Sequence, residues 1–326
     1  MLSVSARAAT LSEPEPGPAP GGDAAAQAAD ALLFASPTTH DHVGRIVVPV
    51  KVNGRGPFRF VVDTGADHST ISPGLARTLG LAPAKTASFV LEGVTGTAQV
   101  SFVTVQSLQA GALDLPATML PVVWAPVMAG ADGILGAAGL TEKSLVVDFE
   151  RNRVTIDRAV APTLRNASTR IQAFRPTHGL ITIHAKVGTT HVLAVIDTGA
   201  ERTLGNLALR DALKARRKTG SLAYVTSVYG ATAEVESGEI QAAPQIELEG
   251  ALHITDVSIV YGDFHIFKVW DMEHTPALII GMDVLGTVAS LGIDFKSQEV
   301  YIASVRSGGM PFGTHGGVLG DQAMKR

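Results

Sequence analysis

The sequence predicts a mainly β protein made of two similar halves. Glycine and proline are frequent, with 34 and 17 residues in a chain of 326, and so many breakers favour short strands over long helices. Apolar and polar residues alternate over 45–52 and 181–187, which is the period of a strand with one buried face. Several landmarks also occur twice in the same order, and this repeat predicts the two halves.

The composition excludes several classes of protein. Hydrophobic residues make up 46% of the chain and charged residues 17%, so a wholly disordered chain is excluded. Aromatic residues are only 5%, so we expect a core of Val, Ile, Leu and Ala. The net charge of −4 offers no basic field, and we therefore expect no nucleic-acid partner.

The chain contains no cysteine, which excludes disulfides, thiolate zinc sites and a cysteine nucleophile. It also contains no apolar stretch of the roughly 18 residues that a membrane span needs, so we expect none. The absence of thiols and the small residues at the start favour a periplasmic or secreted location over a cytoplasmic one.

Both ends of the chain are predicted to be flexible. The segment 1–42 is rich in Ala, Pro and Gly, with EPEPGPAPGG as its clearest run, and is interpreted as a passive linker or, alternatively, a removable pro-segment. Its first ten residues are an ordinary N-terminus or the remnant of a signal peptide. The tail 306–326 has no periodic apolar pattern and is expected to be loose.

The repeat is clearest at Asp63-Thr64-Gly65-Ala66, which recurs 134 residues later as Asp197-Thr198-Gly199-Ala200. Further along, the segment 132–136 corresponds to 277–281 at a separation of 145, so the second copy holds eleven extra residues. We place these in the loop 261–276. The repeat predicts an internal duplication, with an N-terminal lobe at 43–160, a linker at 161–178 and a C-terminal lobe at 179–305. Short helices are expected at 137–143, 210–218 and 282–288.

The repeated motif suggests acid–base chemistry. Each copy follows an apolar strand, 58–62 or 192–196, and its glycine permits a tight turn. Two halves related by a pseudo-twofold axis would bring Asp63 and Asp197 face to face. Carboxyls that close share one proton, so one can activate a water while the other hydrogen-bonds a carbonyl. A single copy would suit an Asx turn equally well, but the paired copies favour catalysis.

These residues resemble the retropepsin-like and pepsin-like aspartic proteases. Each half has the order of that family: a strand, Asp-Thr-Gly-Ala, a glycine-containing flap, and two apolar residues followed by glycine, at 134–136 and 279–281. The segment 281–285 is similar to the start of the short helix in small bacterial members. The resemblance covers about residues 43–305. It implies a bilobal acid-protease fold, in which two β-barrel-like lobes from one chain enclose a cleft, and an aspartic endopeptidase that acts as a monomer.

The resemblance also implies a role for each residue of the motifs. Asp63 and Asp197 would form the catalytic dyad, and Thr64 and Thr198 would lock the two loops by reciprocal hydrogen bonds. Gly65 and Gly199 would donate backbone N–H groups to the carboxylates, and the two apolar-apolar-Gly segments would bury the loops from beneath. Ala66 and Ala200 stand where pepsin-like members tend to have Ser or Thr. The missing hydroxyl donor predicts a less acidic working range.

Two glycine-bearing hairpin tips are expected to act as flaps, and plain hairpin turns are the alternative. They are Gly93-Val94-Thr95-Gly96 and Ser227-Val228-Tyr229-Gly230, each about 30 residues after its aspartate. By the resemblance, Tyr229 would turn its hydroxyl toward the site. It lies in the second half, however, with Thr95 at the equivalent position in the first.

The remaining polar groups carry no chemistry in this interpretation. His40, Asp41 and His42 lack a third ligand at metal-binding spacing, so no metal or cofactor is expected. The expected partner is a peptide or protein substrate in extended form, with apolar side chains beside the cut bond. Two alternatives stay open: a binding module that keeps the scaffold without turnover, and an assembly in which each lobe pairs with its copy in another chain.

Overall fold

The computed structural model describes residues 2–4, 32–37, 39–40, 44–84, 88–110, 113–123, 128, 130–176, 179–215, 224–249 and 252–304. For the stretches before residue 44, and for residue 113, only the course of the backbone is described. The tail 306–326 and most of the segment 1–42, both expected to be flexible, lie outside these ranges.

The first half of the chain is built from short strands, as predicted. Its elements are β1 (Leu2–Val4), β2 (Leu32–Pro37), β3 (Thr39–His40), β4 (Ile46–Val52), β5 (Arg55–Asp63), β6 (Thr70–Ile71), α1 (Pro73–Leu79), β7 (Phe89–Gly93), β8 (Gly96–Val100), β9 (Phe102–Val105), β10 (Leu108–Ala110), β11 (Leu113–Leu115), β12 (Thr118–Pro121), β13 (Gly133–Gly136), the 3-10 helix η2 (Ala137–Leu140), β14 (Ser144–Asp148) and β15 (Arg153–Asp157).

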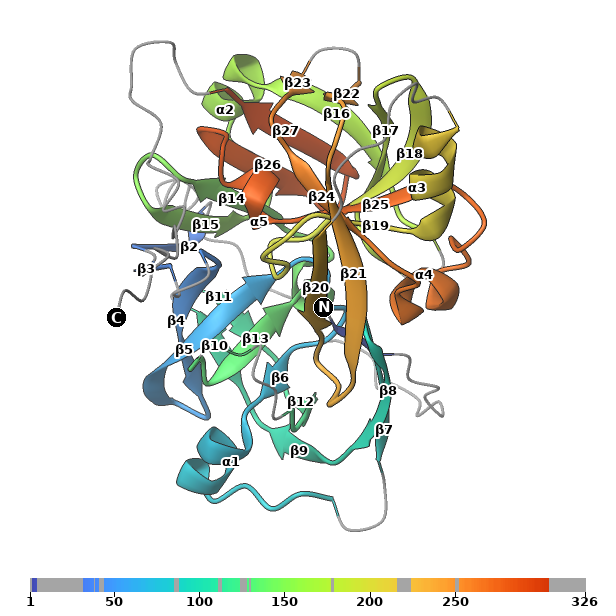
Figure 1. Cartoon of the computed structure of the whole chain (residues 1–326). Helices are drawn as coiled ribbons and strands as arrows, with labels where there is room; N and C mark the ends of the chain where they lie inside the picture. The colour runs from blue at the N-terminus through green and yellow to red at the C-terminus, as the bar shows by residue number, and fades with distance from the viewer. Residues whose placement is uncertain are drawn as a thin grey trace, which may run out of the picture.

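The second half repeats this order of elements after a short connection. It comprises α2 (Pro162–Ala167), β16 (Thr169–Phe174), β17 (Thr182–Val187), β18 (Thr190–Ile196), β19 (Leu204–Gly205), α3 (Leu207–Lys214), β20 (Tyr224–Tyr229), β21 (Val235–Ala242), β22 (Ile246–Leu248), β23 (Leu252–Ile254), β24 (Ser258–Tyr261), α4 (His265–Val269), β25 (Ala277–Ile280), α5 (Met282–Leu285), β26 (Ser290–Asp294) and β27 (Glu299–Ala303). The mainly β, two-lobed fold is therefore confirmed, and Figure 1 shows one lobe above the other.

The strands that lead to the two aspartates pair in the same way in each lobe. In the first lobe β5 forms a hairpin with β4 and lies parallel to β13, which is antiparallel to β6. In the second lobe β18 forms a hairpin with β17 and lies parallel to β25, which is antiparallel to β19. Each aspartate thus lies where a buried central strand ends, a position that neighbouring strands hold firmly.

One antiparallel sheet joins the lobes through β14 and β26. Ser144 is opposite Asp294, and Asp148 is opposite Ser290, so each serine of one half faces the aspartate of the other. Val146 and Gly292 pair at the centre. These pairs interchange when the two halves are exchanged, so a local pseudo-twofold axis passes between Val146 and Gly292.

The extra residues of the second half are spread over several loops, which corrects the expectation that they all lie within 261–276. The ends of β12 and β24, Pro121 and Tyr261, are already 140 residues apart. The starts of β13 and β25, Gly133 and Ala277, are 144 apart. Part of the earlier increase is in the turn 230–234, which is longer than the two-residue turn between β7 and β8.

The helices α1 and α3, one in each lobe, begin at side-chain caps. Ser72 accepts a hydrogen bond from Leu75 N at 3.1 Å at the start of α1, and Asn206 accepts one from Leu209 N at 2.9 Å at the start of α3. The helix α3 was expected at 210–218; its last three expected residues lie outside the described ranges. The helices η2 and α5 lie where short helices were predicted.

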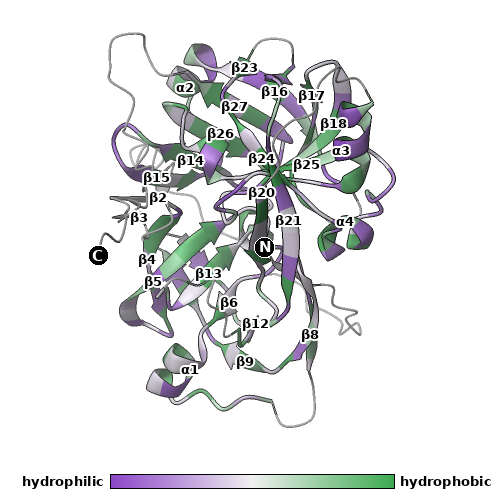
Figure 2. Cartoon of the chain, in the orientation of Figure 1, coloured by the Kyte–Doolittle hydropathy of each residue, from purple (hydrophilic) through white to green (hydrophobic). Residues whose placement is uncertain are grey.

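The largest buried cluster extends through both lobes and consists mainly of Val, Ile and Leu, as the composition predicts. Figure 2 shows these apolar residues on the strands, with polar residues on the outer turns. Full burial of one such side chain contributes about 1.5–3 kcal/mol relative to exposure. The core therefore provides a rigid base for the loops at the ends of β5 and β18.

The connection between the lobes is more ordered than the linker expected at 161–178. It forms α2 and β16, and β16 pairs with both β27 and β17. In the same way, β2 pairs with β15 and β3 with β4, so the end of the expected arm contributes strands to the sheet. Each half therefore has an added strand on the outer side of its last hairpin.

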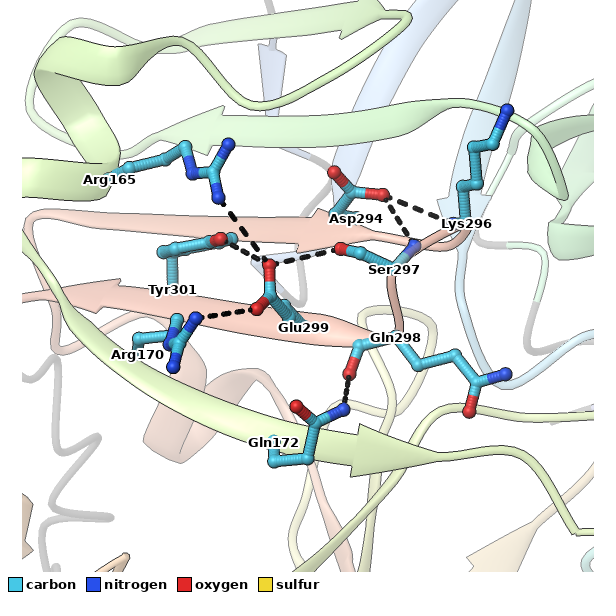
Figure 3. Close-up of polar contacts among 9 residues, drawn as sticks. All are labelled: Arg165, Arg170, Gln172, Asp294, Lys296, Ser297, Gln298, Glu299 and Tyr301. Carbon is cyan, nitrogen blue, oxygen red and sulfur yellow. Dashed lines mark hydrogen bonds and ion pairs between the residues drawn. The ribbon is translucent and has the colours of Figure 1, made fainter.

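A nearly buried carboxylate fastens this connection to the second lobe (Figure 3). Glu299 accepts hydrogen bonds from Tyr301 Oη at 2.5 Å and from Ser297 Oγ at 3.1 Å. It also accepts one from Arg170 Nη1 at 2.9 Å, and Arg165 Nη2 lies 3.8 Å away. The Tyr301 hydrogen bond, together with the serine and the two guanidinium groups, lowers the pKa of Glu299 below its usual range.

Candidate active site

The two Asp-Thr-Gly-Ala loops meet at the interface between the lobes. Asp63 is the last residue of β5, and Asp197 directly follows β18. Their side chains are almost completely buried, with 2% and 0% of the residue surface exposed. A Cβ atom added to Gly65 would lie under 3.0 Å from the Asp197 carboxyl, and one added to Gly199 would meet Asp63 equally closely. Each carboxyl therefore lies against the glycine of the opposite loop, and no larger residue would fit there.

Two threonines join the loops across the interface. Thr64 Oγ1 donates to the carbonyl of Ile196 at 2.8 Å, and Thr198 Oγ1 donates to the carbonyl of Val62 at 2.8 Å. Each hydroxyl also accepts a hydrogen bond from the backbone N–H of the other threonine. Thr64 N donates to Thr198 Oγ1 at 3.2 Å, and Thr198 N donates to Thr64 Oγ1 at 3.1 Å. All four bonds are buried, and they hold the two loops in one relative position.

Backbone N–H groups orient the carboxylates. Gly65 N donates to Asp63 Oδ1 at 2.9 Å, and Gly199 N donates to Asp197 Oδ1 at 2.8 Å. Asp197 Oδ1 also accepts a hydrogen bond from Ala200 N at 3.1 Å. The other oxygen of this residue, Oδ2, is buried and has no hydrogen-bond partner among the described residues. It is therefore an unsatisfied polar atom that can interact with a bound molecule.

The apolar-apolar-Gly segments pass directly beneath the loops. The residues after β13 donate backbone hydrogen bonds to Ala66 and Asp67, and those after β25 donate to Ala200 and Glu201. Gly136 N donates to Ser69 Oγ, and Gly281 N donates to Thr203 Oγ1. A Cβ at Gly136 would lie under 3.0 Å from the backbone of His68. The glycine therefore allows the two backbones to approach closely.

The surroundings of Asp197 favour its protonated form. Burial, and next the nearby charge of Asp63, raise the pKa of Asp197 from 3.8 to about 7. Two buried carboxyls whose charges act on each other cannot both ionise at low cost, so the pair keeps one proton into the neutral range. This is the property that a water-activating pair of acids needs.

Two hairpins meet above the loops. The first hairpin, Phe89–Val100, consists of β7 and β8 with Val94 and Thr95 at its turn. The second hairpin, Tyr224–Ala242, consists of β20 and β21. Thr95 Oγ1 and Thr232 Oγ1, both buried, form a hydrogen bond at 2.9 Å between the two tips. Figure 1 shows the second hairpin extending from the upper lobe down to the first.

Each tip packs among residues of the other lobe. Val94 of the first hairpin belongs to an apolar cluster with Val195, against which Ala200 packs. Ala231 of the second hairpin belongs to a cluster with Ala66 and Ile134. Each tip thus shares an apolar cluster with residues close in the chain to Asp197 or Asp63.

The second hairpin differs from the expectation in one respect. Its turn is 230–234, so Val228 and Tyr229 lie at the end of β20 and only Gly230 belongs to the turn. Tyr229 pairs with Val235 and is 58% exposed, so its hydroxyl does not reach the buried aspartates in this arrangement. In the first hairpin Gly93 and Gly96 flank the turn as expected.

Other polar groups near the loops have structural contacts. Asp132 Oδ2 accepts a hydrogen bond from Arg59 N at 2.9 Å, and His68 Nδ1 lies 3.3 Å from Asp67 Oδ2. The sequence analysis did not single out Asp283, which accepts two hydrogen bonds from Thr203 beneath the second loop. The repeat could have drawn attention to its partner Thr203, which lies 134 residues after Ser69. The hydroxyls of Ser69 and Thr203 each accept a hydrogen bond from the glycine N–H beneath their own loop.

Within the described ranges, no group of three or more His, Asp or Glu side chains is arranged to hold a metal ion. The side chains of His40, Asp41 and His42 lie outside the described residues. None of the described helices combines the length and the apolar character that crossing a membrane requires.

Comparison with known proteins found one family. A family model described as aspartyl protease matches residues 48–138 and 183–284, which together make up more than half of the chain. One matched stretch contains 63–66 and the other contains 197–200. No curated protein matches the chain.

Proposed function

The chain belongs to the aspartyl protease family, and we propose that it is an endopeptidase whose two catalytic residues are Asp63 and Asp197. The observation that carries this proposal is the buried meeting of two carboxyls from separate lobes, each lying against the glycine of the opposite loop. Four threonine hydrogen bonds across the interface hold both residues in this position.

In the proposed reaction the pair shares one proton. Asp197, with its raised pKa, holds this proton and donates a hydrogen bond to the carbonyl oxygen of the peptide bond. Ionised Asp63 takes a proton from a water molecule as the water oxygen attacks the carbonyl carbon, and Asp197 gives its proton to the carbonyl oxygen as that oxygen becomes a hydroxyl. The tetrahedral intermediate then breaks at the C–N bond, and Asp63 returns the proton to the leaving nitrogen while Asp197 recovers its own.

The substrate is proposed to bind as an extended strand between the hairpins and the two loops. Backbone groups of the hairpins can pair with such a strand, and the apolar clusters around Val94 and Ala231 can receive apolar side chains beside the cut bond. Because both aspartates are buried, the hairpins must lift before a substrate enters. The hairpins therefore act as flaps in this proposal, and the role includes Gly93, Thr95, Gly96, Val228, Tyr229 and Gly230.

A monomer arising from an internal duplication is part of the proposal. The repeated order of elements and the symmetric pairing of β14 with β26 support the duplication. Both aspartates come from one chain, so no second copy is needed to complete the site. The proposed lobes comprise 43–160 and 179–305, extended at the start by the strand β2.

Hydrolysis of a peptide library tests the proposal. Wild type should cleave internal bonds, whereas Asp63→Asn and Asp197→Asn should each lose at least about a thousandfold in kcat/KM, because neither variant can share a proton between two acids. Asp114→Asn, which changes an exposed aspartate on β11, is the matched control and should cleave normally. Full cleavage by either dyad variant would exclude the mechanism, and peptide binding without cleavage by wild type would favour a binding module.

A further inference from the structure

A histidine of the second lobe contacts the side of the first hairpin. His265 is the first residue of α4, in the loop between β24 and β25. Its Nε2 lies 2.7 Å from Glu92 Oε2 and 3.0 Å from Thr97 Oγ1. Glu92 and Thr97 are opposite each other on β7 and β8, and Thr97 Oγ1 donates to Glu92 Oε2 at 2.6 Å. The three side chains form a closed set of contacts between the lobes.

The donors and acceptors of this set are determined by its geometry. Because Thr97 gives its hydroxyl proton to Glu92, the atoms that face His265 Nε2 are a carboxylate oxygen and a hydroxyl lone pair. Both are acceptors, so Nε2 must carry a hydrogen. The imidazole is 33% exposed, so water competes with these bonds only in part.

We propose that His265 is a positioning residue that latches the first hairpin in its closed position and thereby controls the entry of substrate. This inference rests on the proposed function, because it assigns the first hairpin as a cover of the peptide site. The hairpin is held at its tip by Val94 and by the Thr95–Thr232 bond, along β7 by pairing with β1, and at its side by His265.

The latch is closed in this structure, in which β1 also pairs with β7. A peptide strand that pairs with a neighbouring strand takes about 4.7–4.9 Å of space. A hairpin lifted by that amount cannot keep a hydrogen bond of 2.7 Å between Glu92 and His265. A peptide that enters between the hairpin and the two loops and lifts the hairpin therefore breaks the latch, and the latch lowers the fraction of protein that is open and competent to bind.

This role predicts an effect on KM rather than on kcat. The apparent dissociation constant equals the intrinsic constant divided by the open fraction, so a weaker latch gives tighter apparent binding. A partly exposed hydrogen bond of this kind shifts such an equilibrium by about three- to tenfold. His265→Ala is therefore expected to lower KM by about three- to tenfold and to leave kcat unchanged.

The test combines hydrogen exchange with kinetics. In His265→Ala, the backbone amides of 89–100 should exchange faster than in wild type, without any substrate present, and KM should fall as stated. His265→Gln, whose amide N–H can still donate to Glu92, should restore both values toward wild type. The matched control is His274→Ala, which changes a 93% exposed histidine of the same loop beside Glu273 and should match wild type in both measurements. Glu92→Ala tests the same contact from the first lobe if His265→Ala does not fold.

The outcomes separate this inference from the proposed function. Unchanged exchange and unchanged KM in His265→Ala would overturn the latch even if peptides are cleaved. A fall in kcat at constant KM would also overturn it. Faster exchange in His265→Ala, reversed in His265→Gln, together with no cleavage of any peptide by wild type, would support the latch and reject the protease proposal.

Discussion

Thr64 and Thr198 each accept a hydrogen bond from the backbone N–H of the other, at 3.1 and 3.2 Å respectively, and each donates to a carbonyl of the opposite strand. Their positions in the chain are 134 residues apart, yet their hydroxyls are the closest link between the two loops. Because all four bonds are buried, the alignment of the two aspartates and the association of the lobes depend on the same contacts.

Thr64→Val and Thr198→Val are expected to reduce both stability and activity. Valine has a similar shape but leaves two buried backbone groups without partners, so each change should cost about 1–3 kcal/mol in free energy of unfolding. The double variant should lose less than the sum, because both residues belong to one network. Denaturant unfolding and kcat measure these effects. Thr141→Val, at an exposed hydroxyl, serves as the control and should unfold like wild type.

The pH dependence of activity should follow the shared proton. Because the pKa of Asp197 is raised to about 7, activity should fall as the pH rises through about 7, where the pair loses its proton. A pH–rate profile measures this, and a maximum below about pH 3 would contradict it.

The same pKa shift predicts a change in stability. The pKa of Asp197 is higher in the folded protein than in the unfolded chain, so ionisation of this carboxyl opposes folding. This ionisation cost is absent below about pH 4 and grows as the pH rises to about 7. Asp197→Asn removes the ionisable group. The free energy of unfolding of this variant, relative to that of wild type, should therefore increase between pH 4 and pH 8. Thermal unfolding across this range tests the sign; a constant difference between the two proteins would reject it.

A hydroxyl introduced after the second motif should make the enzyme more acidic. Ala200→Ser supplies a donor beside the Asp197 carboxylate, whose Oδ2 has no partner among the described groups. Stabilising the ionised form lowers its pKa, so the alkaline limb of the pH–rate profile should move down by about half a unit to one unit. Ala138→Ser, near the surface of η2, is a control in which the limb should stay in place.

Glu299→Gln should destabilise the connection between the lobes at neutral pH by about 1–2 kcal/mol, because its arginines lose a charged partner and Tyr301 loses a strong acceptor. The pKa of Glu299 lies below its usual value in the folded protein, so its contribution is present above that usual value, 4.5, and is lost as the pH falls through the folded-state pKa. Wild type and variant should therefore converge in acid. A gap that widens in acid would contradict this account.

Some features could be predicted only in part, for reasons that particular residues illustrate. The alternation over 45–52 and the glycines around Val94 gave the strand β4 and the first turn, because both depend on neighbours in the chain. The second turn was misplaced by a few residues, because Tyr229 and Val235 pair across a longer loop than the first half contains. The strand β2 was missed because it lies in a segment whose Ala, Pro and Gly content favoured a flexible arm, and because it pairs with β15, more than a hundred residues later in the chain.

The sequence by itself determined the class of fold and the two loops that bear the aspartates, because hydrophobic periodicity and repeated motifs are local properties. Only the tertiary structure decided that the hairpin tips meet through Thr95 and Thr232, and that His265 of the second lobe reaches Glu92 of the first. Those contacts join residues that are 137 and 173 positions apart. Their formation depends on how the two lobes are oriented, which no pattern within either lobe specifies.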